Sequence, residues 1–299
     1  ARALFAGNAA HVIQPLDYPL TAAFGIVLAG SAHAVGWGMP RGGSQSLADA
    51  LTAHLRSLGG EVVTDTPIED IDALPPSDAV MLDITPHQIA DIAANHLPDG
   101  YLRALRRYRY GPGVFKVDWA LSEPVPWTAK AARHAGTVHI GGTFDEIAVS
   151  EHAAYYGRVP REPYVLLAQQ SIADPTRAPE GKHTLWAYCH VPHGSDADMT
   201  DVIENQIERF APGFKDTILA KHTMNAPQMQ AYNPNYIGGD INGGVQDIGQ
   251  LFLRPTPRLQ AYTTPNPSLF ICSSASPPGG GVHGMAGYHA AQVALKNFN

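Results

Sequence analysis

The middle of the chain carries the clearest alternation of apolar and polar residues, and this alternation predicts a sheet. In residues 113–121 a phenylalanine, a valine, a tryptophan and a leucine alternate with valine, lysine, aspartate and alanine, which is typical of a half-exposed strand. Because long excursions separate the expected strands, we predict a mixed or antiparallel sheet with helices on one side, an α+β layer. The remaining elements of this region are strands at 137–140, 164–172 and 183–191 and amphipathic helices at 145–156 and 198–210.

The segment that precedes this region has a helix–strand–strand–helix order, which is typical of α/β proteins. Leucines recur at helical spacing after Ser44, a residue type favoured as an N-cap, and Gly59-Gly60 end the predicted helix. The rest of the segment is predicted to form strands at 61–64 and 79–84 and a helix at 87–97.

The stretch from Leu20 to Gly38 is nearly long enough and apolar enough to resemble a membrane span. It contains Ser31, His33 and several glycines, whereas a span requires about 20 strongly apolar residues. We therefore predict a buried helix that ends near Gly36, with a membrane-contacting surface for a lipid substrate as the alternative.

The end of the chain, residues 265–295, reads as a strand, a glycine turn and a helix. An apolar run at 268–272 predicts a buried strand, and a helical pattern begins near Val282, after three consecutive glycines. Unpaired N–H groups and the positive end of a helix dipole make such a turn a seat for an anion or a cofactor. The formal G-x-G-x-x-G spacing here has no following strand and acidic residue, so it does not predict a dinucleotide fingerprint.

Composition and charge narrow the functional classes. The net charge of −7, without a basic run, argues against nucleic-acid binding, which needs clustered Lys and Arg. Cys189 and Cys272 lie in apolar runs and are expected to be buried thiols in a reducing compartment. The expected free thiols and the absence of a visible signal peptide favour a cytoplasmic location. His190 and His193 flank a proline at a strand end, where structural roles are favoured, and no metal site is predicted.

Five segments carry a resemblance to a known family. They are PRGGSQSLADALTAHLRSLGGEV (40–62), Ile84-Thr85-Pro86, RYRYGPGVFKVDWAL (107–121), the GGD loop (238–240) and SASPPGGGVHGMAGYHAA (274–291). Together they resemble the phytoene-desaturase-like branch of the FAD-dependent oxidoreductases, and the last segment is the most specific.

The resemblance implies an FAD site and names its residues. In that family the C-terminal glycine turn and helix lie under the flavin, the segment corresponding to 66–68 lies along the adenine, and Thr85-Pro86 lies near the middle of the cofactor. His283 would tune the flavin or act as an acid or base, and its alternative role is packing at the helix start. The implied cofactor-binding residues are Ile68, Thr85, Pro86, Gly279, Gly280, Gly281, Val282, His283, Gly284 and Met285.

The resemblance also implies a division of the chain and a missing part. We expect an incomplete FAD-binding, Rossmann-like α/β domain interleaved with a mixed-sheet substrate domain, because the strand, G-x-G-x-x-G turn and helix that open the family are absent. The expected parts are 1–36, helices of the substrate domain; 37–96, a portion of the FAD domain; 97–263, the substrate domain; and 264–299, the last strand, turn and helix of the FAD domain.

The resemblance implies removal of a hydride from a lipophilic or polyene-like substrate to FAD. We expect little activity or FAD binding without the missing segment, and we expect self-association or a partner to cover the exposed sheet edge. Peripheral membrane contact is a further expectation. The alternative function is a cofactor-free binding or interaction module derived from the same fold.

Overall fold

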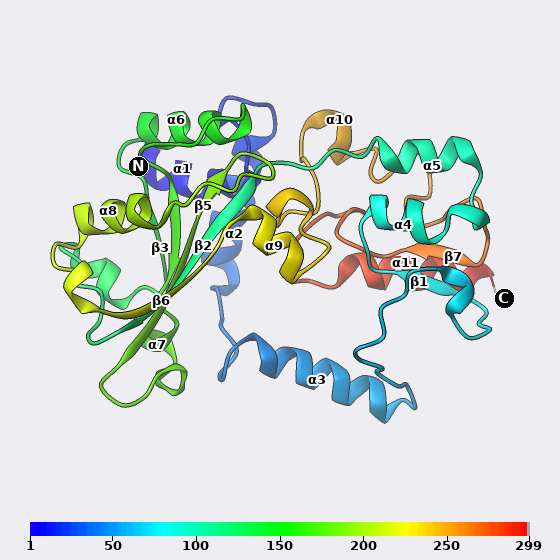
Figure 1. Cartoon of the computed structure of the whole chain (residues 1–299), viewed down its shortest axis with the longest axis horizontal. Helices are drawn as coiled ribbons and strands as arrows, with labels where there is room; N and C mark the ends of the chain where they lie inside the picture. The colour runs from blue at the N-terminus through cyan, green and yellow to red at the C-terminus, as the bar shows by residue number, and fades with distance from the viewer. Residues whose placement is uncertain (298–299) are drawn as a thin grey trace.

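The computed structural model describes residues 1–297, so residues 298–299 of the last expected part lie outside the described residues. Figure 1 shows two lobes, and the larger one contains a sheet. This sheet has five strands. The sheet is antiparallel, in the order β3–β4–β5–β2–β6, and β2 aligns with β5 along its whole length, from Gly113 opposite Val191 to Leu121 opposite His183. Its strands are β2 (Gly113–Leu121), β3 (Thr137–Ile140), β4 (Val165–Ala168), β5 (His183–Val191) and β6 (Ile218–Met224).

One face of this sheet forms the main hydrophobic core. The alternating residues of β2 and β5, including Val117, Trp119 and Leu185, are buried beneath α8 (Thr200–Phe210). Ile203 and Ile207 of α8 are fully buried against them, as the helical spacing predicts. The predicted alternation and the antiparallel pairing are therefore confirmed.

The opposite face of the sheet is covered at one end only. α1 (Arg2–Ala9) and α6 (Phe144–Tyr155) pack there through Ala6, Ile147 and Tyr164. Helices therefore lie on both faces of the sheet, and the prediction of helices on one side only is wrong. Thr143 and Glu146 form a capping box that fixes the start of α6. The uncovered part of this face borders a cavity, which is described below.

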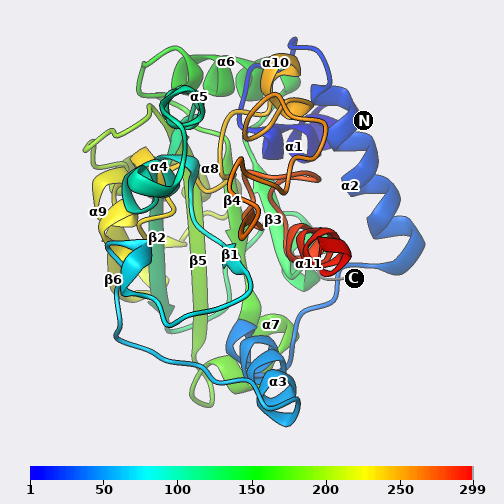
Figure 2. The ribbon, with the colours of Figure 1, turned by 90° about the vertical axis from the view of Figure 1, so that its right-hand side faces the viewer.

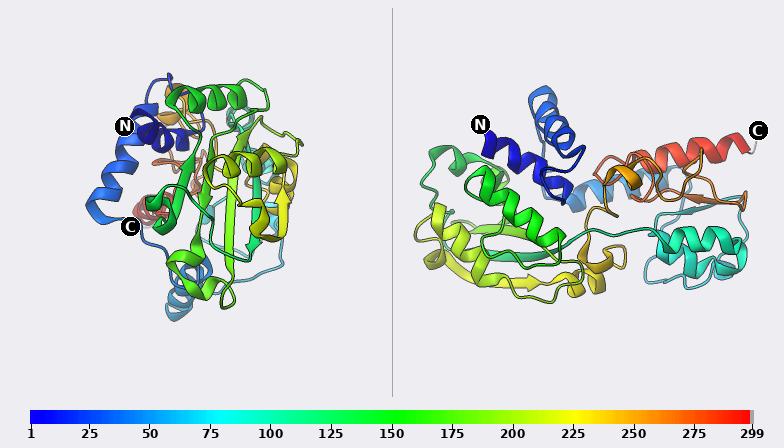
Figure 3. Two further views of the ribbon diagram at one scale, coloured as in Figure 1. Left: turned by 90° about the vertical axis from the view of Figure 1, so that its left-hand side faces the viewer. Right: turned by 90° about the horizontal axis from the view of Figure 1, so that it is seen from above.

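The smaller lobe contains a parallel pair of strands, β1 (Val80–Leu82) and β7 (Leu269–Ile271), as Figure 3 shows from above. α4 (Pro86–Ile92) and α5 (Asp99–Arg106) bury Ile89 and Leu105 against these strands. α11 (Met285–Asn297) contributes a buried row of three alanines, at positions 286, 290 and 294. The mixed α/β character, with parallel and antiparallel pairing, agrees with the predicted fold class.

The strand predicted at 61–64 is wrong. Within residues 1–297, β1 and β7 form a sheet of two strands and pair with no third strand. Residues 61–64 are extended without pairing, and Val63 is 74% exposed. A strand needs a hydrogen-bonded neighbour, and the described residues provide none at this position.

Two apolar helices are exposed, which corrects the predicted burial. The expected helix at 20–38 forms as α2 (Thr21–Val35), but it buries only Thr21 and Gly25, where it touches α1. α3 (Ser44–Ser57) begins after Gly43, so Ser44 is its first residue and not its cap, and α3 has no buried residue at all. In Figure 2 both helices stand at the margin of the molecule. Apart from the contact of α2 with α1, no element within residues 1–297 covers the apolar side chains of these two helices.

The remaining helices connect these parts. No helix of residues 1–297 is long and apolar enough to cross a membrane. The short helices are α7 (Gln170–Ala173), α9 (Ala226–Tyr232) and α10 (Ile248–Leu251), with 3-10 turns at Ala10–Val12, Ile71–Ala73, Ala94–His96, Lys130–His134, Pro175–Arg177, Lys215–Thr217 and Ile237–Gly239.

Candidate functional site

The glycine turn and the Thr85 turn leave the small parallel sheet from the same edge. Leu82 and Ile271 are paired residues at the carboxyl ends of β1 and β7, and the N–H of Cys272 donates to the carbonyl of Leu82 at 3.0 Å. Ligands of open α/β sheets bind at the carboxyl ends of parallel strands. The structure therefore brings two of the three predicted cofactor segments to a position that suits a ligand.

Thr85 and Pro86 form a rigid helix start at this edge. Thr85 is buried and caps α4, in a capping box with Gln88, and Pro86 is the first residue of that helix. Ile68, the third predicted segment, lies half-buried in the unpaired connection between α3 and Ile71. The structure therefore gives Thr85 and Pro86 a fixed geometry, whereas the segment of Ile68 has no sheet to hold it.

The glycine turn exposes backbone N–H groups. Gly279 and Gly281 have φ values of 110° and 145°, which residues with a side chain rarely adopt. A Cβ atom on Gly280 would lie 2.9 Å from the carbonyl oxygen of Asn242, so the turn packs tightly on the GGD loop. Within residues 1–297 the N–H groups of Gly280, Gly281 and Val282 have no acceptor, so they are available to a ligand.

His283 caps the helix that follows the turn. Its Nδ1 accepts a hydrogen bond from the N–H of Met285, the first residue of α11, at 3.0 Å. The imidazole is exposed, as is the side chain of Met285. In the structure His283 therefore acts as a helix cap, and its role towards a flavin stays a prediction.

A cavity of about 1760 Å³ lies against the uncovered face of the large sheet. Trp127, Trp186 and Ala168 form part of its wall, and Leu4 of α1 closes another side. Val282 of the glycine turn lines the same cavity. The rim of the cavity therefore reaches the glycine turn at Val282.

Two histidines form a neutral pair at the wall of this cavity. His139 lines the cavity, and its Nε2 lies 3.1 Å from the Nε2 of His11. Burial lowers the pKa of His11 to about 3, with the neighbouring His139 and His190 adding to the effect, and burial lowers the pKa of His139 to about 4. Both imidazoles are therefore neutral at pH 7, and one proton lies between the two Nε2 atoms.

Behind this pair lies a fully buried histidine–carboxylate pair. His190 Nδ1 and Glu151 Oε2 are 2.7 Å apart, and both side chains are 1% exposed. Tyr164 lies between the two pairs, with its ring 5.7 Å from that of His139 and 5.7 Å from that of His190. His190 was expected to have a structural role, and this buried partner is in keeping with one.

Several of these residues carry no signal in the sequence. His11 and His139 are separated by 128 positions and Glu151 and His190 by 39, so no local spacing links them. The face of β5 that carries Trp186, Tyr188 and His190 offers a partial signal, because aromatic rings at alternate positions opposite a buried face suggest a second function for that face.

Both cysteines are free, as expected from the sequence. Cys189 is fully buried, and burial raises its pKa far above the ordinary thiol value. Cys272 is half-buried at the edge that carries the glycine turn, and burial, followed by the charge of Asp83, raises its pKa to about 12. Both thiols are therefore protonated at neutral pH and are poor nucleophiles.

Comparison with known proteins relates the chain to oxidoreductases. The chain is 24% identical over 303 residues to the pyridine nucleotide-disulfide oxidoreductase domain-containing protein 2 of Mus musculus. The alignment covers 88% of this chain and 52% of the mouse protein. The protein of the same name from Rattus norvegicus is 24% identical over 310 residues, with the same coverage. No protein-family model matches the chain.

A solved structure has the same fold. An oxidoreductase from Methanosarcina mazei superposes with a TM-score of 0.60 at 14% sequence identity, over 98% of this chain and 64% of the other. The chain is thus similar in sequence to pyridine nucleotide-disulfide oxidoreductase domain-containing protein 2 and shares the fold of the Methanosarcina mazei structure. It spans about half the length of the curated relatives that it matches.

Proposed function

We propose that the chain supplies the substrate cavity and one side of the flavin site of an FAD-dependent oxidoreductase that removes a hydride from a lipophilic substrate. The observation that carries this proposal is the position of Val282, which belongs to the glycine turn and lines the sheet cavity. The names of the mouse and rat relatives support an oxidoreductase. The resemblance of residues 274–291 to the phytoene-desaturase-like branch supports FAD.

The residues at the turn fit a flavin. Gly279 and Gly280 allow the turn to pack closely on the neighbouring loop, because Cβ atoms there would lie 2.9 Å from Arg254 Nη1 and from the carbonyl oxygen of Asn242. The free N–H groups of the turn and the start of α11 present positive partial charge to a ligand. Gly280, Gly281 and Val282 would hold the flavin ring, and Thr85-Pro86 would contact a more distant part of the cofactor.

The residues of this chain would position the substrate and keep water out. FAD, when bound, supplies a hydride acceptor. Trp127, Trp186 and Val282 provide an apolar wall that would align a lipophilic carbon skeleton beside the turn. His139 adds a neutral imidazole to that wall, so it presents no charge to a lipophilic substrate at pH 7. The proposal therefore requires few charged groups, in agreement with the apolar lining.

A charge at the turn should weaken ligand binding in the cavity. Val282→Asp is expected to weaken the binding of a fluorescent polyene fatty acid about tenfold, because a carboxylate replaces apolar contact surface. Val282 is 94% exposed, so the fold should tolerate the change. Leu259→Asp is the matched control, since Leu259 is fully exposed and lies outside the cavity lining. Equal affinities of the two variants would contradict the assignment of the cavity.

We propose further that the apolar side of α3 binds the polypeptide that carries the nucleotide-binding unit of the site. Leu51 and Leu55 of α3 are 65% and 44% exposed, and Val63 after the helix is 74% exposed. Monomeric proteins rarely leave such rows of large apolar side chains uncovered. The relatives are about twice as long as the chain, so they have length available for such a unit. The chain is anchored before α3, where Gly42 N–H donates to Asp174 at 2.6 Å.

This partner is tested by flavin retention. The chain alone is expected to lose FAD on gel filtration, and co-expression with a nucleotide-binding segment encoded beside it should restore stoichiometric flavin absorbance. Leu51→Glu should lower the affinity for that segment about tenfold without changing the stability of the chain, because Leu51 has no buried contact to lose. Leu259→Glu serves as the control. Stoichiometric FAD on the chain alone would contradict the proposal and would also exclude the cofactor-free alternative.

A further inference from the structure

Arg254 is a buried guanidinium with unpaired N–H groups. Its side chain is 1% exposed, and Nη2 donates to the hydroxyl of Tyr108 at 2.8 Å and to the carbonyl of Gly243 at 3.4 Å. Nε and Nη1 have no hydrogen-bond partner among the described residues. None of the ion pairs formed by residues 1–297 includes Arg254. A buried charge in this state is costly unless a partner neutralises it.

The buried carboxylate of the neighbouring loop is already occupied. Asp240, which is 1% exposed, accepts hydrogen bonds from the N–H groups of Gly111 at 2.7 Å, Asn242 at 2.7 Å and Gly244 at 3.1 Å. These three bonds hold the GGD loop and leave the guanidinium of Arg254 without a counter-ion. The partner of Arg254 must therefore come from outside the described part of the chain.

The unpaired side of Arg254 faces the glycine turn. A Cβ atom on Gly279 would lie 2.9 Å from Nη1 of Arg254 and 3.8 Å from Oε1 of Gln246. The next two residues, Gly280 and Gly281, have free N–H groups, and the 13-residue helix α11 begins shortly after them. The hydroxyl oxygen of Ser273, between β7 and the turn, is also buried without a partner. The unpaired Nη1 of Arg254 and the free N–H groups of Gly280 and Gly281 therefore belong to the same turn.

We propose that Arg254 and the glycine turn form an anion-binding site. Nε and Nη1 lie on different edges of the guanidinium, and Nη2, which is common to both edges, already donates to Tyr108 and Gly243. Nη1, which faces the turn, can therefore donate one hydrogen bond to an anion that also accepts from the free N–H groups of the turn. A diphosphate offers several acceptor oxygens for these donors, and the N1–C2=O edge of a flavin ring, which carries the negative charge of the reduced form, offers two acceptor atoms. The anion site rests on the geometry, whereas its assignment to a flavin rests on the proposed function.

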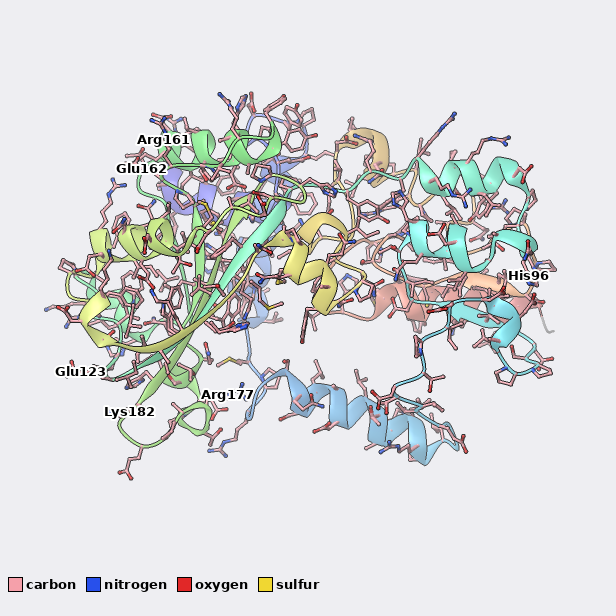
Figure 4. The ribbon with its side chains drawn as sticks, viewed as in Figure 1. His96, Glu123, Arg161, Glu162, Arg177 and Lys182 are labelled. Atoms are coloured by element: carbon pink, nitrogen blue, oxygen red, sulfur yellow. The ribbon has the colours of Figure 1, made fainter. Side chains whose placement is uncertain are left out.

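The test measures thermal stability with inorganic diphosphate as the probe. At ten times its dissociation constant, diphosphate should raise the Tm of the full chain by about 2–3 °C relative to chloride at equal ionic strength. Arg254→Met should abolish this rise, and without the probe its Tm should be no lower than that of the unmodified chain, because an uncompensated charge is removed. Arg161→Met, at an exposed arginine labelled in Figure 4, should keep the full rise.

A second variant and a second probe keep the outcomes distinct. Should Arg254→Met fail to fold, Arg254→Lys should weaken diphosphate binding about tenfold in calorimetry, because the compact ammonium of lysine does not reproduce the fixed direction of the Nη1 donor. Riboflavin, which has no phosphate, replaces diphosphate in a parallel series. The probe that raises the Tm identifies whether the site binds phosphate oxygens or the acceptor edge of a flavin ring. An absent response to both probes, or an equal response of Arg254→Met, would overturn the anion site. A normal anion response without flavin retention by the co-expressed complex would overturn only the proposed function.

Discussion

Between pH 6.5 and pH 4.5 the free energy of unfolding is expected to fall by about 4 kcal/mol because of two histidines alone. His11 and His139 have pKa values lowered to about 3 and about 4 by burial, against 6.5 in the unfolded chain. Over this range the unfolded chain takes up a proton at each imidazole while the folded chain does not. The stabilisation is therefore fully present above about pH 6.5 and is lost as the pH falls towards the folded values. Urea denaturation at a series of pH values measures this loss.

Variants separate the histidines from other titrating groups. The double variant His11→Gln, His139→Gln should show little change in stability over the same range, whatever its stability at pH 7. His134→Gln, at an exposed histidine, should keep the full slope. Carboxyls such as Asp247 also have a lowered pKa, here because Arg109 donates hydrogen bonds to the carboxylate, and they lose their contribution mainly below pH 4.5. An unchanged slope in the double variant would show that the pair is not buried in its neutral form.

Helices and strands with one buried face could be predicted from the sequence. Whether a helix or strand is buried could not be predicted where its burial depends on contacts with residues far away in the sequence. β2 and β5 were predicted because the alternation of apolar and polar residues along each strand indicates which face is buried in the core. β6 was missed because it is an edge strand with little burial, and Leu219 within it is 57% exposed. The helix of α3 was predicted from its leucine spacing, but this spacing does not reveal whether anything covers the leucines. Propensity is local, whereas burial is a property of the assembled fold.

The same distinction between local sequence and distant contacts applies to the candidate site. The glycine turn was visible because three glycines, a preceding strand and a following helix are contiguous in sequence. The packing of Gly280 on Asn242 and the approach of Arg254 to Gly279 were not visible, because they depend on how the loops cross. Within the turn itself, the site residues are predicted from sequence, and the structure adds the unpaired guanidinium of Arg254 beside them.

Glu151→Ala is expected to lower the free energy of unfolding by about 3–5 kcal/mol, because it removes one partner of a fully buried pair and leaves His190 without its acceptor. Glu123→Ala, at the exposed glutamate labelled in Figure 4, should change stability by less than about 0.5 kcal/mol. A double-mutant cycle with His190→Gln, measured by urea denaturation at pH 7, separates the stability lost through packing from the stability lost with the hydrogen bond between the two side chains. If the two residues act as a pair, the double variant should be less destabilised than the sum of the single variants. If the losses in the free energy of unfolding are additive, each side chain stabilises this end of the cavity by packing alone. Glu151 would then have no role in holding the orientation of His190 behind the cavity wall.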